Sequence, residues 1–124
     1  FLDYYSKFEG EERVIVVQIE TRKALDNLEE ILSTQGIDVA FVGPLDLSTN
    51  LGIPTQYDNP SFKEALEKIL KTCREYDVAP GIYAVSLQNA EEMISKGFRF
   101  VSLMSDMRIL KSGCEEALKK FGRK

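Results

Sequence analysis

The sequence of 124 residues contains no histidine and no tryptophan. Histidine is the most common general base and the most common metal ligand in proteins. Catalysis by this chain alone would therefore depend on carboxylates, lysines, tyrosines or bound water. Only two cysteines occur, Cys73 and Cys114, and their spacing does not suggest a zinc site. Two free thiols are typical of a cytoplasmic protein.

Long apolar runs and clusters of positive charge are also missing. No run approaches the ~20 residues that a membrane span needs, and no signal peptide is visible. The net charge of −4, without any basic cluster, argues against nucleic acid as a partner. A content of 44% hydrophobic and 29% charged residues is typical of a soluble globular domain.

Four short runs rich in Val, Ile and Phe alternate with helical patterns. The runs predict strands at residues 14–19, 39–42, 80–85 and 100–104. Because continuous apolar strands alternate with amphipathic helices, we expect a parallel sheet covered by helices. Four such βα units form either a small open sheet or half of an eight-stranded barrel.

The helices are predicted from apolar residues at helical spacing and from their end signals. One helix carries the stripe Leu25–Leu32 and is expected to end at Gly36, and another carries Phe62–Cys73. Ser86 should cap a third helix, which Gly97 should close, and a fourth, over 109–121, should break near Gly113. Residues 48–60 contain Gly52, Pro54 and Pro60 and predict a long loop, with or without a short turn of helix.

Two carboxylates follow the first two predicted strands, Glu20 and Asp46. Neighbouring parallel strands lie about 4.8 Å apart, so acids after two neighbours can converge at the edge where α/β proteins bind ligands. Such a pair is typical of a site for a hard divalent cation. The alternative is two unrelated helix caps or surface charges.

Two further residues could belong to such a site. Asp106, after the fourth strand, is a candidate third ligand, but its position favours a helix cap. Lys23 could suggest a Schiff-base enzyme. We expect it instead to be a solvated charge in the first turn of a helix.

Two segments carry a family resemblance. Val-Gln-Ile-Glu-Thr (17–21) and Gly-Ile-Asp-Val-Ala-Phe-Val-Gly-Pro-Leu-Asp-Leu-Ser (36–48) resemble the pyruvate-dependent class II aldolases of the HpcH/HpaI family. That family includes 4-hydroxy-2-oxoheptanedioate and 2-keto-3-deoxy sugar-acid aldolases. The resemblance covers nearly the whole chain. It implies an α/β fold in which residues 1–124 are the C-terminal half, four βα units, of a single (β/α)8 TIM-barrel domain.

The resemblance also implies a site and an activity. Glu20 and Asp46 would bind Mg²⁺, Mn²⁺ or Co²⁺, and Gln18 would lie against the oxo acid. The backbone N–H groups of Leu45 and Asp46 would hold the carboxylate of pyruvate. The reaction would be the cleavage of a 2-oxo-4-hydroxy acid to pyruvate and an aldehyde.

The groups that transfer protons in this family, a histidine–aspartate pair, and the arginine over the enolate belong to the other half of the barrel. No residue of this chain can be assigned those catalytic roles, so we expect the chain alone to be inactive. The expected partner is the missing N-terminal half or another copy of the chain, in a homo-oligomer. The aromatic residues Phe1, Tyr4 and Tyr5 would pack against that missing half.

Three positions depart from the family pattern. Leu45 replaces a residue that is often small, Tyr83 an aliphatic one, and Ser105 an apolar one. They indicate either an altered aldehyde pocket or neutral changes in packing. A citrate lyase β-like or malyl/citramalyl-CoA-type lyase, and a non-catalytic half-barrel, remain alternative functions.

Overall fold

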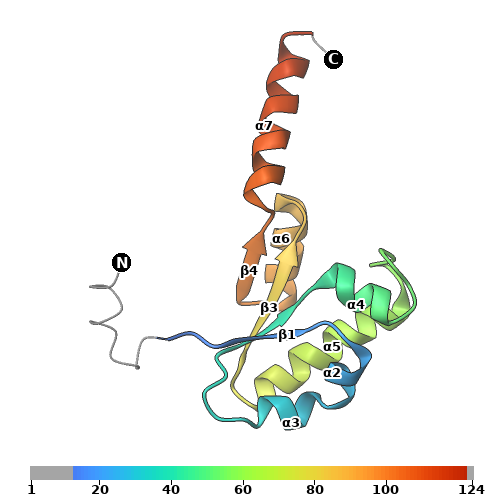
Figure 1. The fold of residues 1–124 in the computed structure, drawn as a ribbon, viewed down its shortest axis with the longest axis vertical. Helices are drawn as coiled ribbons and strands as arrows, with labels where there is room; N and C mark the ends of the chain where they lie inside the picture. Colours follow the sequence, from blue (N-terminus) through green and yellow to red (C-terminus); the bar gives the residue numbers. More distant parts are fainter. Residues whose placement is uncertain (1–12, 123–124) are drawn as a thin grey trace.

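The computed structural model describes residues 13–122, so the aromatic residues Phe1, Tyr4 and Tyr5 lie outside the described part. Four strands form one sheet in the order β1-β2-β3-β4, and every neighbouring pair is parallel (Figure 1). This confirms the predicted α/β fold of four consecutive βα units. The strands are β1 Val16–Ile19, β2 Val39–Val42, β3 Ala79–Ala84 and β4 Phe100–Leu103.

In the described part of the chain, six helices connect and follow the strands. The short helices α2 and α3 link β1 to β2, α4 and α5 link β2 to β3, α6 links β3 to β4, and α7 follows β4. Among residues 13–122, no helix has both the length and the apolar character to cross a membrane. The helices are α2 Arg22–Asp26, α3 Leu28–Leu32, α4 Pro44–Asn50, α5 Pro60–Glu75, α6 Leu87–Lys96 and α7 Asp106–Lys120.

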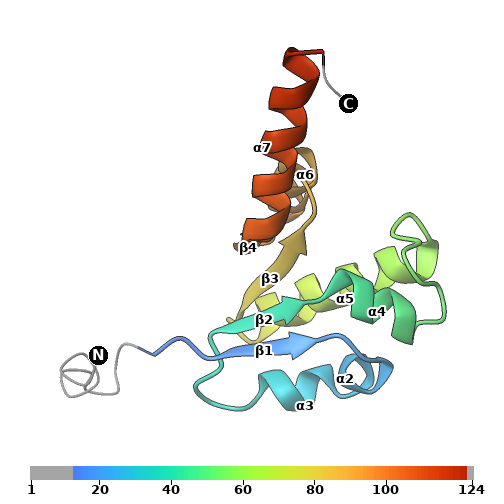
Figure 2. The same ribbon diagram turned by 45° about the horizontal axis from the view of Figure 1, so that its top comes forward.

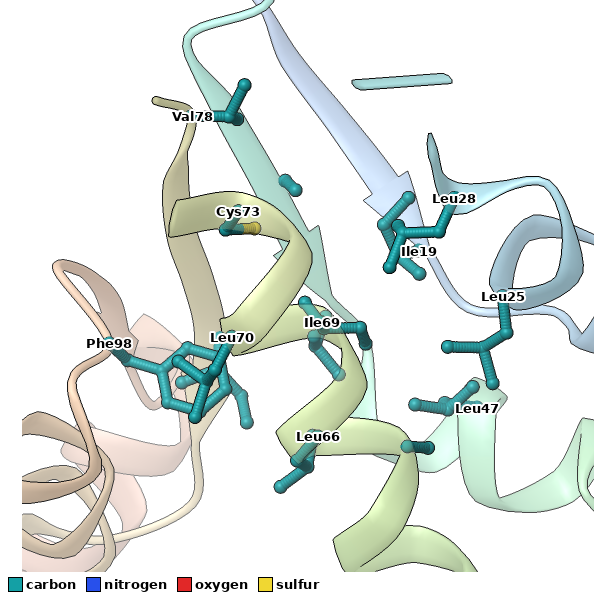
Figure 3. Packing of buried hydrophobic residues seen from close by; sticks show 14 of the residues in the cluster. Ile19, Leu25, Leu28, Leu47, Leu66, Ile69, Leu70, Cys73, Val78 and Phe98 are labelled. Carbon is teal, nitrogen blue, oxygen red and sulfur yellow. The ribbon is translucent and has the colours of Figure 1, made fainter. Parts of the chain in front are cut away.

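The hydrophobic core lies between one face of the sheet and the helices, with α5 at its centre (Figure 3). Ile69 and Cys73 of α5 are fully buried, together with Ile19 of β1 and Leu28 of α3. Burial raises the pKa of the Cys73 thiol to about 11, because a thiolate in apolar surroundings loses its hydration. Cys73 is therefore a neutral core residue, as its place on the apolar stripe predicts.

The opposite face of the sheet has no such cover among the described residues. Val16 on β1 and Phe100 on β4 remain 41% and 43% exposed, and the rings of Phe41 and Phe100 meet edge to face at 6.0 Å. Gly81 makes room for this contact, since a Cβ there would lie 2.9 Å from Cδ2 of Phe41. The uncovered face is thus apolar and open.

Helix α7 stands apart from the sheet and the other helices (Figures 1 and 2). None of its residues is buried, and Met107, Leu110 and Leu118 are among its exposed apolar side chains. The predicted break near Gly113 is wrong, because α7 is continuous across it. A single glycine inside a helix costs only about 1 kcal/mol, which the other fourteen residues of this helix outweigh.

Two other predictions about helix ends need correction. The predicted helix over 25–32 divides at Asn27, whose backbone leaves the helical region, and ends at Leu32, four residues before Gly36. Ser105 caps α7 by accepting a hydrogen bond from the N–H of Arg108, whereas Asp106, the predicted cap, is the first residue of the helix. The predicted cap of α6 at Ser86 and its end at Gly97 are confirmed.

Thr55, in the loop between α4 and α5, has a φ of 62°, which is unfavourable for a β-branched residue. Replacing Thr55 by glycine should remove about 1–2 kcal/mol of backbone strain. This gain should exceed the cost of glycine's extra conformational freedom in the unfolded chain, about 0.5–1 kcal/mol. We expect Thr55→Gly to raise the free energy of unfolding by about 0.5–1 kcal/mol in urea titrations at fixed protein concentration. The hydrogen bond from its N–H to Oγ of Ser48 stays in place.

Thr49→Gly is the matched control, because Thr49 lies inside α4 and glycine there should lower stability by about 1 kcal/mol. A loss of stability in both variants would show that the backbone of Thr55 is not strained.

Candidate functional site

Asp46 lies in the first turn of a helix rather than at the end of a strand. β2 ends at Val42, and Pro44 begins α4 at its first position, where proline's missing N–H and restricted φ are favourable. The N–H of Leu47 then donates to the carbonyl of Gly43 at 2.9 Å. The loop predicted over 48–60 therefore begins with the last turn of this helix, since α4 continues to Asn50.

The carboxylates of Glu20 and Asp46 face the same glycine. A Cβ added to Gly43 would lie 3.1 Å from Oε2 of Glu20 and 3.4 Å from Oδ2 of Asp46. The two oxygens are therefore no farther apart than the sum of these distances. The parallel register that pairs Ile19 with Val42 brings them together, in agreement with the convergence predicted from the strand ends.

Glu20 is half-buried and Asp46 is exposed, so both can be reached from solvent. Within residues 13–122, no third Asp, Glu, His or Cys completes a group of three with metal-binding geometry. Asp106 is thus not part of the pair. Lys23 is an exposed residue of α2, as expected for a solvated charge.

The start of α4 presents backbone N–H groups next to the carboxylates. The first N–H groups of a helix have no partner within the helix, and here the N-cap residue Gly43 has no side chain with which to accept them. Leu45 and Asp46 therefore carry the first available N–H groups, because Pro44 has none. The Leu45 side chain is 54% exposed.

An open hollow of about 420 Å³ lies beside the carboxylate pair. Gln18, Asp46 and Leu45 line one part of it, and Tyr83 and Arg108 line another. The structure thus brings Gln18, Leu45 and Asp46, the three residues predicted to bind substrate, into the lining of one hollow.

Tyr57 and Arg108 also line the hollow, and neither residue is a candidate on sequence pattern. Tyr57 lies in the loop after α4 and packs on Phe62 with ring centroids 5.4 Å apart. Arg108 lies in the first turn of α7. The signal that could have found Arg108 is its place just after the carboxyl end of a strand, where α/β proteins position ligand-binding groups.

Comparison with known proteins gives consistent results. The HpcH/HpaI aldolase/citrate lyase family model matches residues 5–112. The 4-hydroxy-2-oxo-heptane-1,7-dioate aldolase of Escherichia coli (strain ATCC 8739) is 35% identical over 120 residues, which are 97% of this chain and 45% of that protein. The 2-keto-3-deoxy-L-rhamnonate aldolase of Escherichia coli O1:K1 / APEC is 35% identical over 107 residues, 86% of this chain and 40% of that protein.

Among solved structures, an HpcH/HpaI aldolase/citrate lyase family protein from Burkholderia cenocepacia J2315 superposes with a TM-score of 0.87 at 28% identity. The match covers 96% of this chain and 46% of that one. The four βα units therefore correspond to about half of the TIM-barrel-type fold of these relatives, and the chain spans about half the length of the curated relatives it matches. Since the family model covers most of its residues, the chain belongs to the HpcH/HpaI aldolase/citrate lyase family.

Proposed function

We propose that this chain is the metal- and oxo-acid-binding half of a class II aldolase, a lyase that cleaves a 2-oxo-4-hydroxy acid to pyruvate and an aldehyde. The observation that carries the proposal is the pair of carboxylates, Glu20 and Asp46, that face Gly43. Membership of a family whose named relatives are aldolases supports the class of reaction. Residues 1–124 would form the C-terminal half of a single barrel domain.

The residues present fit a divalent cation. Glu20 and Asp46 offer hard carboxylate oxygens, which Mg²⁺, Mn²⁺ and Co²⁺ accept as ligands. The missing side chain at Gly43 leaves open the space that both oxygens face. When bound there, the cation would act as a Lewis acid on the 2-oxo acid.

The start of α4 would hold the carboxylate of the oxo acid. The N–H groups of Leu45 and Asp46 lie in the first turn, where the helix dipole favours a negative charge. Gln18 lines the same hollow, and its amide can donate to or accept from an oxygen of the bound acid. These residues bind and orient the substrate.

Proton transfer would depend on groups outside this chain. The sequence has no histidine, and the histidine–aspartate pair expected for proton transfer would belong to the other half of the barrel. The open apolar face of the sheet is where the complementary half, or a second copy, would pack. The partners are thus a small oxo acid and another barrel half.

The first prediction concerns the metal ligands. Asp46→Asn should weaken Mn²⁺ binding by about tenfold or more, because the affinity of oxygen sites depends on the number of charged ligands. Asp106→Asn is the control, since Asp106 lies outside the pair and its side chain accepts only the N–H of Met107. The measurement is calorimetric titration with Mn²⁺, and equal affinities of the two variants would contradict the assignment of Asp46.

Gly43→Ala tests the same site without removing a charge. Its φ of −91° allows alanine, but the new Cβ would lie 3.1 Å from Oε2 of Glu20 and displace that carboxylate. We expect weaker Mn²⁺ binding with thermal unfolding unchanged. Gly113→Ala, where nothing lies within 4 Å of the added Cβ, should bind Mn²⁺ as the wild type does.

The second prediction concerns assembly. Both edge strands, β1 and β4, and the apolar face between them favour pairing, so light scattering should give at least twice the monomer mass. Val16→Glu should reduce association, because it places a charge on this face. Leu87→Glu, on an exposed position of α6, is the control, and a well-folded wild-type monomer in dilute solution would contradict the prediction.

The third prediction is that the chain alone releases pyruvate from a 4-hydroxy-2-oxo acid at a rate near background. Positioned acid–base catalysis contributes about 10²–10⁴-fold, and this chain has no histidine to provide it. The assay couples pyruvate to lactate dehydrogenase with Mg²⁺ or Mn²⁺ present, with the Escherichia coli heptanedioate aldolase as the positive control. Metal-dependent turnover by the chain alone would show that the proton-transfer groups lie within these 124 residues.

A further inference from the structure

A second hollow lies between helices α5 and α6, at the carboxyl end of β3. Both helices pack on β3 but make little contact with each other, so the core is incompletely filled at this place. The hollow measures about 210 Å³. Four side chains that are at most 5% exposed line it: Phe62 and Leu66 of α5, Ile82 of β3 and Met93 of α6. The hollow is therefore an extension of the hydrophobic core that opens to solvent.

This second hollow is separate from the one beside the carboxylate pair, but the two adjoin. Pro44, Tyr57, Tyr83 and Val85 line both of them, whereas Asp46 lines only the hollow of the candidate site. The buried residues of the second hollow belong to the core on the helix-covered face of the sheet. A barrel half packed on the opposite, open face would therefore leave the second hollow accessible.

The lining of the second hollow favours an aromatic ring. The rings of Tyr57 and Phe62 lie 5.4 Å apart at an interplanar angle of 57°, and Tyr83 adds a third ring to the lining. Aromatic rings attract one another in tilted and offset arrangements, and the thioether of Met93 makes favourable contacts with ring edges. An apolar cavity of about 150 Å³ accepts one benzene molecule, so this hollow has room for one ring with a small substituent.

The charged groups of the same lining are paired with each other. Nζ of Lys63 lies 3.3 Å from Oδ1 of Asp58, and Nζ of Lys96 lies 2.6 Å from Oε1 of Glu92. These two pairs account for the charged residues that line the hollow. An ionic ligand would have to compete with one of the pairs, whereas a neutral ligand would not.

Asn89 provides a hydrogen-bond donor in this lining. Its carboxamide oxygen accepts the N–H of Val85 at 3.2 Å, and its backbone N–H donates to Oγ of Ser86 at 3.1 Å. Both the side chain and the backbone of Asn89 are thus held in place. The amide NH₂ group can donate to an oxygen of a ligand.

We propose that the hollow between α5 and α6 is a binding site for a neutral, single-ring aromatic molecule that carries an oxygen acceptor. The ring would be bound by Tyr57, Phe62 and Met93, and the oxygen by Asn89. Such a ligand would also contact residues that line the candidate site. The inference does not depend on the metal or on the proposed function, because neither Glu20 nor Asp46 lines this hollow.

The methyl groups of methionine provide the test. The chain has three methionines, Met93, Met104 and Met107, and of these Met93 lines the hollow. The full 124-residue chain, labelled with ¹³C at the methionine methyl groups, is titrated with phenol in the absence of metal, and Met93→Leu assigns the resonance. Phenol should shift the Met93 methyl in a saturable manner, with a dissociation constant of about 1 mM, and leave the other two unchanged.

Two further ligands of similar size define the chemical class. Cyclohexanol has the hydroxyl group but no aromatic ring, and it should bind about two- to tenfold more weakly than phenol, which is the effect of an aromatic contact. Benzoate has the ring but carries a charge, and it should also bind more weakly than phenol.

Tyr57→Ala tests the aromatic lining. It should weaken phenol binding by about two- to tenfold. Tyr76→Ala is the matched control, because Tyr76 is 38% exposed where Tyr57 is 37% exposed, and it lies after α5, outside the lining of the hollow. This control should bind phenol as the wild type does.

Glu92→Gln tests the argument from charge. It leaves Lys96 without its partner, so it should strengthen benzoate binding by about two- to fivefold, the effect of an exposed ion pair, while phenol binding stays the same. Glu91→Gln removes the neighbouring exposed carboxylate, which does not line the hollow, and should change neither affinity.

Each outcome supports or overturns the inference. The expected result is a saturable shift of Met93 alone, an affinity for phenol above those for cyclohexanol and benzoate, and a loss of affinity in Tyr57→Ala only. The absence of a saturable shift, or equal shifts of all three methionine methyl groups, would overturn the site. Equal binding of phenol and benzoate, or of phenol by the wild type and Tyr57→Ala, would overturn the ligand class.

Discussion

The parallel pairing of β1 with β2 is the constraint on which the candidate site depends. Their register places Ile19 opposite Val42, so the residue after each strand reaches the same edge of the sheet. Glu20 and Gly43 are those residues, and Asp46 follows one helical turn later. A shift of one residue would turn Glu20 to the other face. The two carboxylates converge only because the apolar side chains of Ile19 and Val42, both buried, fix the register.

The same register separates the two faces of the sheet. Val17 and Ile19 point into the core with the helices, whereas Val16, Gln18 and Phe41 belong to the opposite face. Helices α2, α3 and α5 cover only the first face (Figure 2). The candidate site residues and the apolar surface that remains open therefore lie on the same side, so packing of a second barrel half against this face would also close the candidate site.

The strands could be predicted from sequence because buried parallel strands are short and continuously apolar. β2 was predicted to the residue, and β1, β3 and β4 to within two residues at each end. The start of α4 could not be predicted in this way, because Gly43-Pro44 after a strand resembles a turn as much as the first turn of a helix. Ser105 and Asp106 are adjacent candidate caps, and only backbone geometry distinguishes them. The place of Arg108 just after a strand could be read from sequence, but its presence in the same hollow as Asp46 follows from the order of the strands, which local pattern does not contain.

The candidate site is built from residues that contribute little to the core. Gln18, Asp46 and Arg108 are exposed, and Glu20 is only half-buried, whereas the buried side chains of the same elements, Ile19 and Leu47, point the other way. Substitutions of the exposed and half-buried residues of the candidate site should therefore change the packing of the core very little. The lining of the hollow beside the carboxylate pair can therefore change in a lineage of such proteins while the scaffold stays constant, and chains that share this fold at low sequence identity can diverge at this edge of the sheet without passing through an unfolded ancestor.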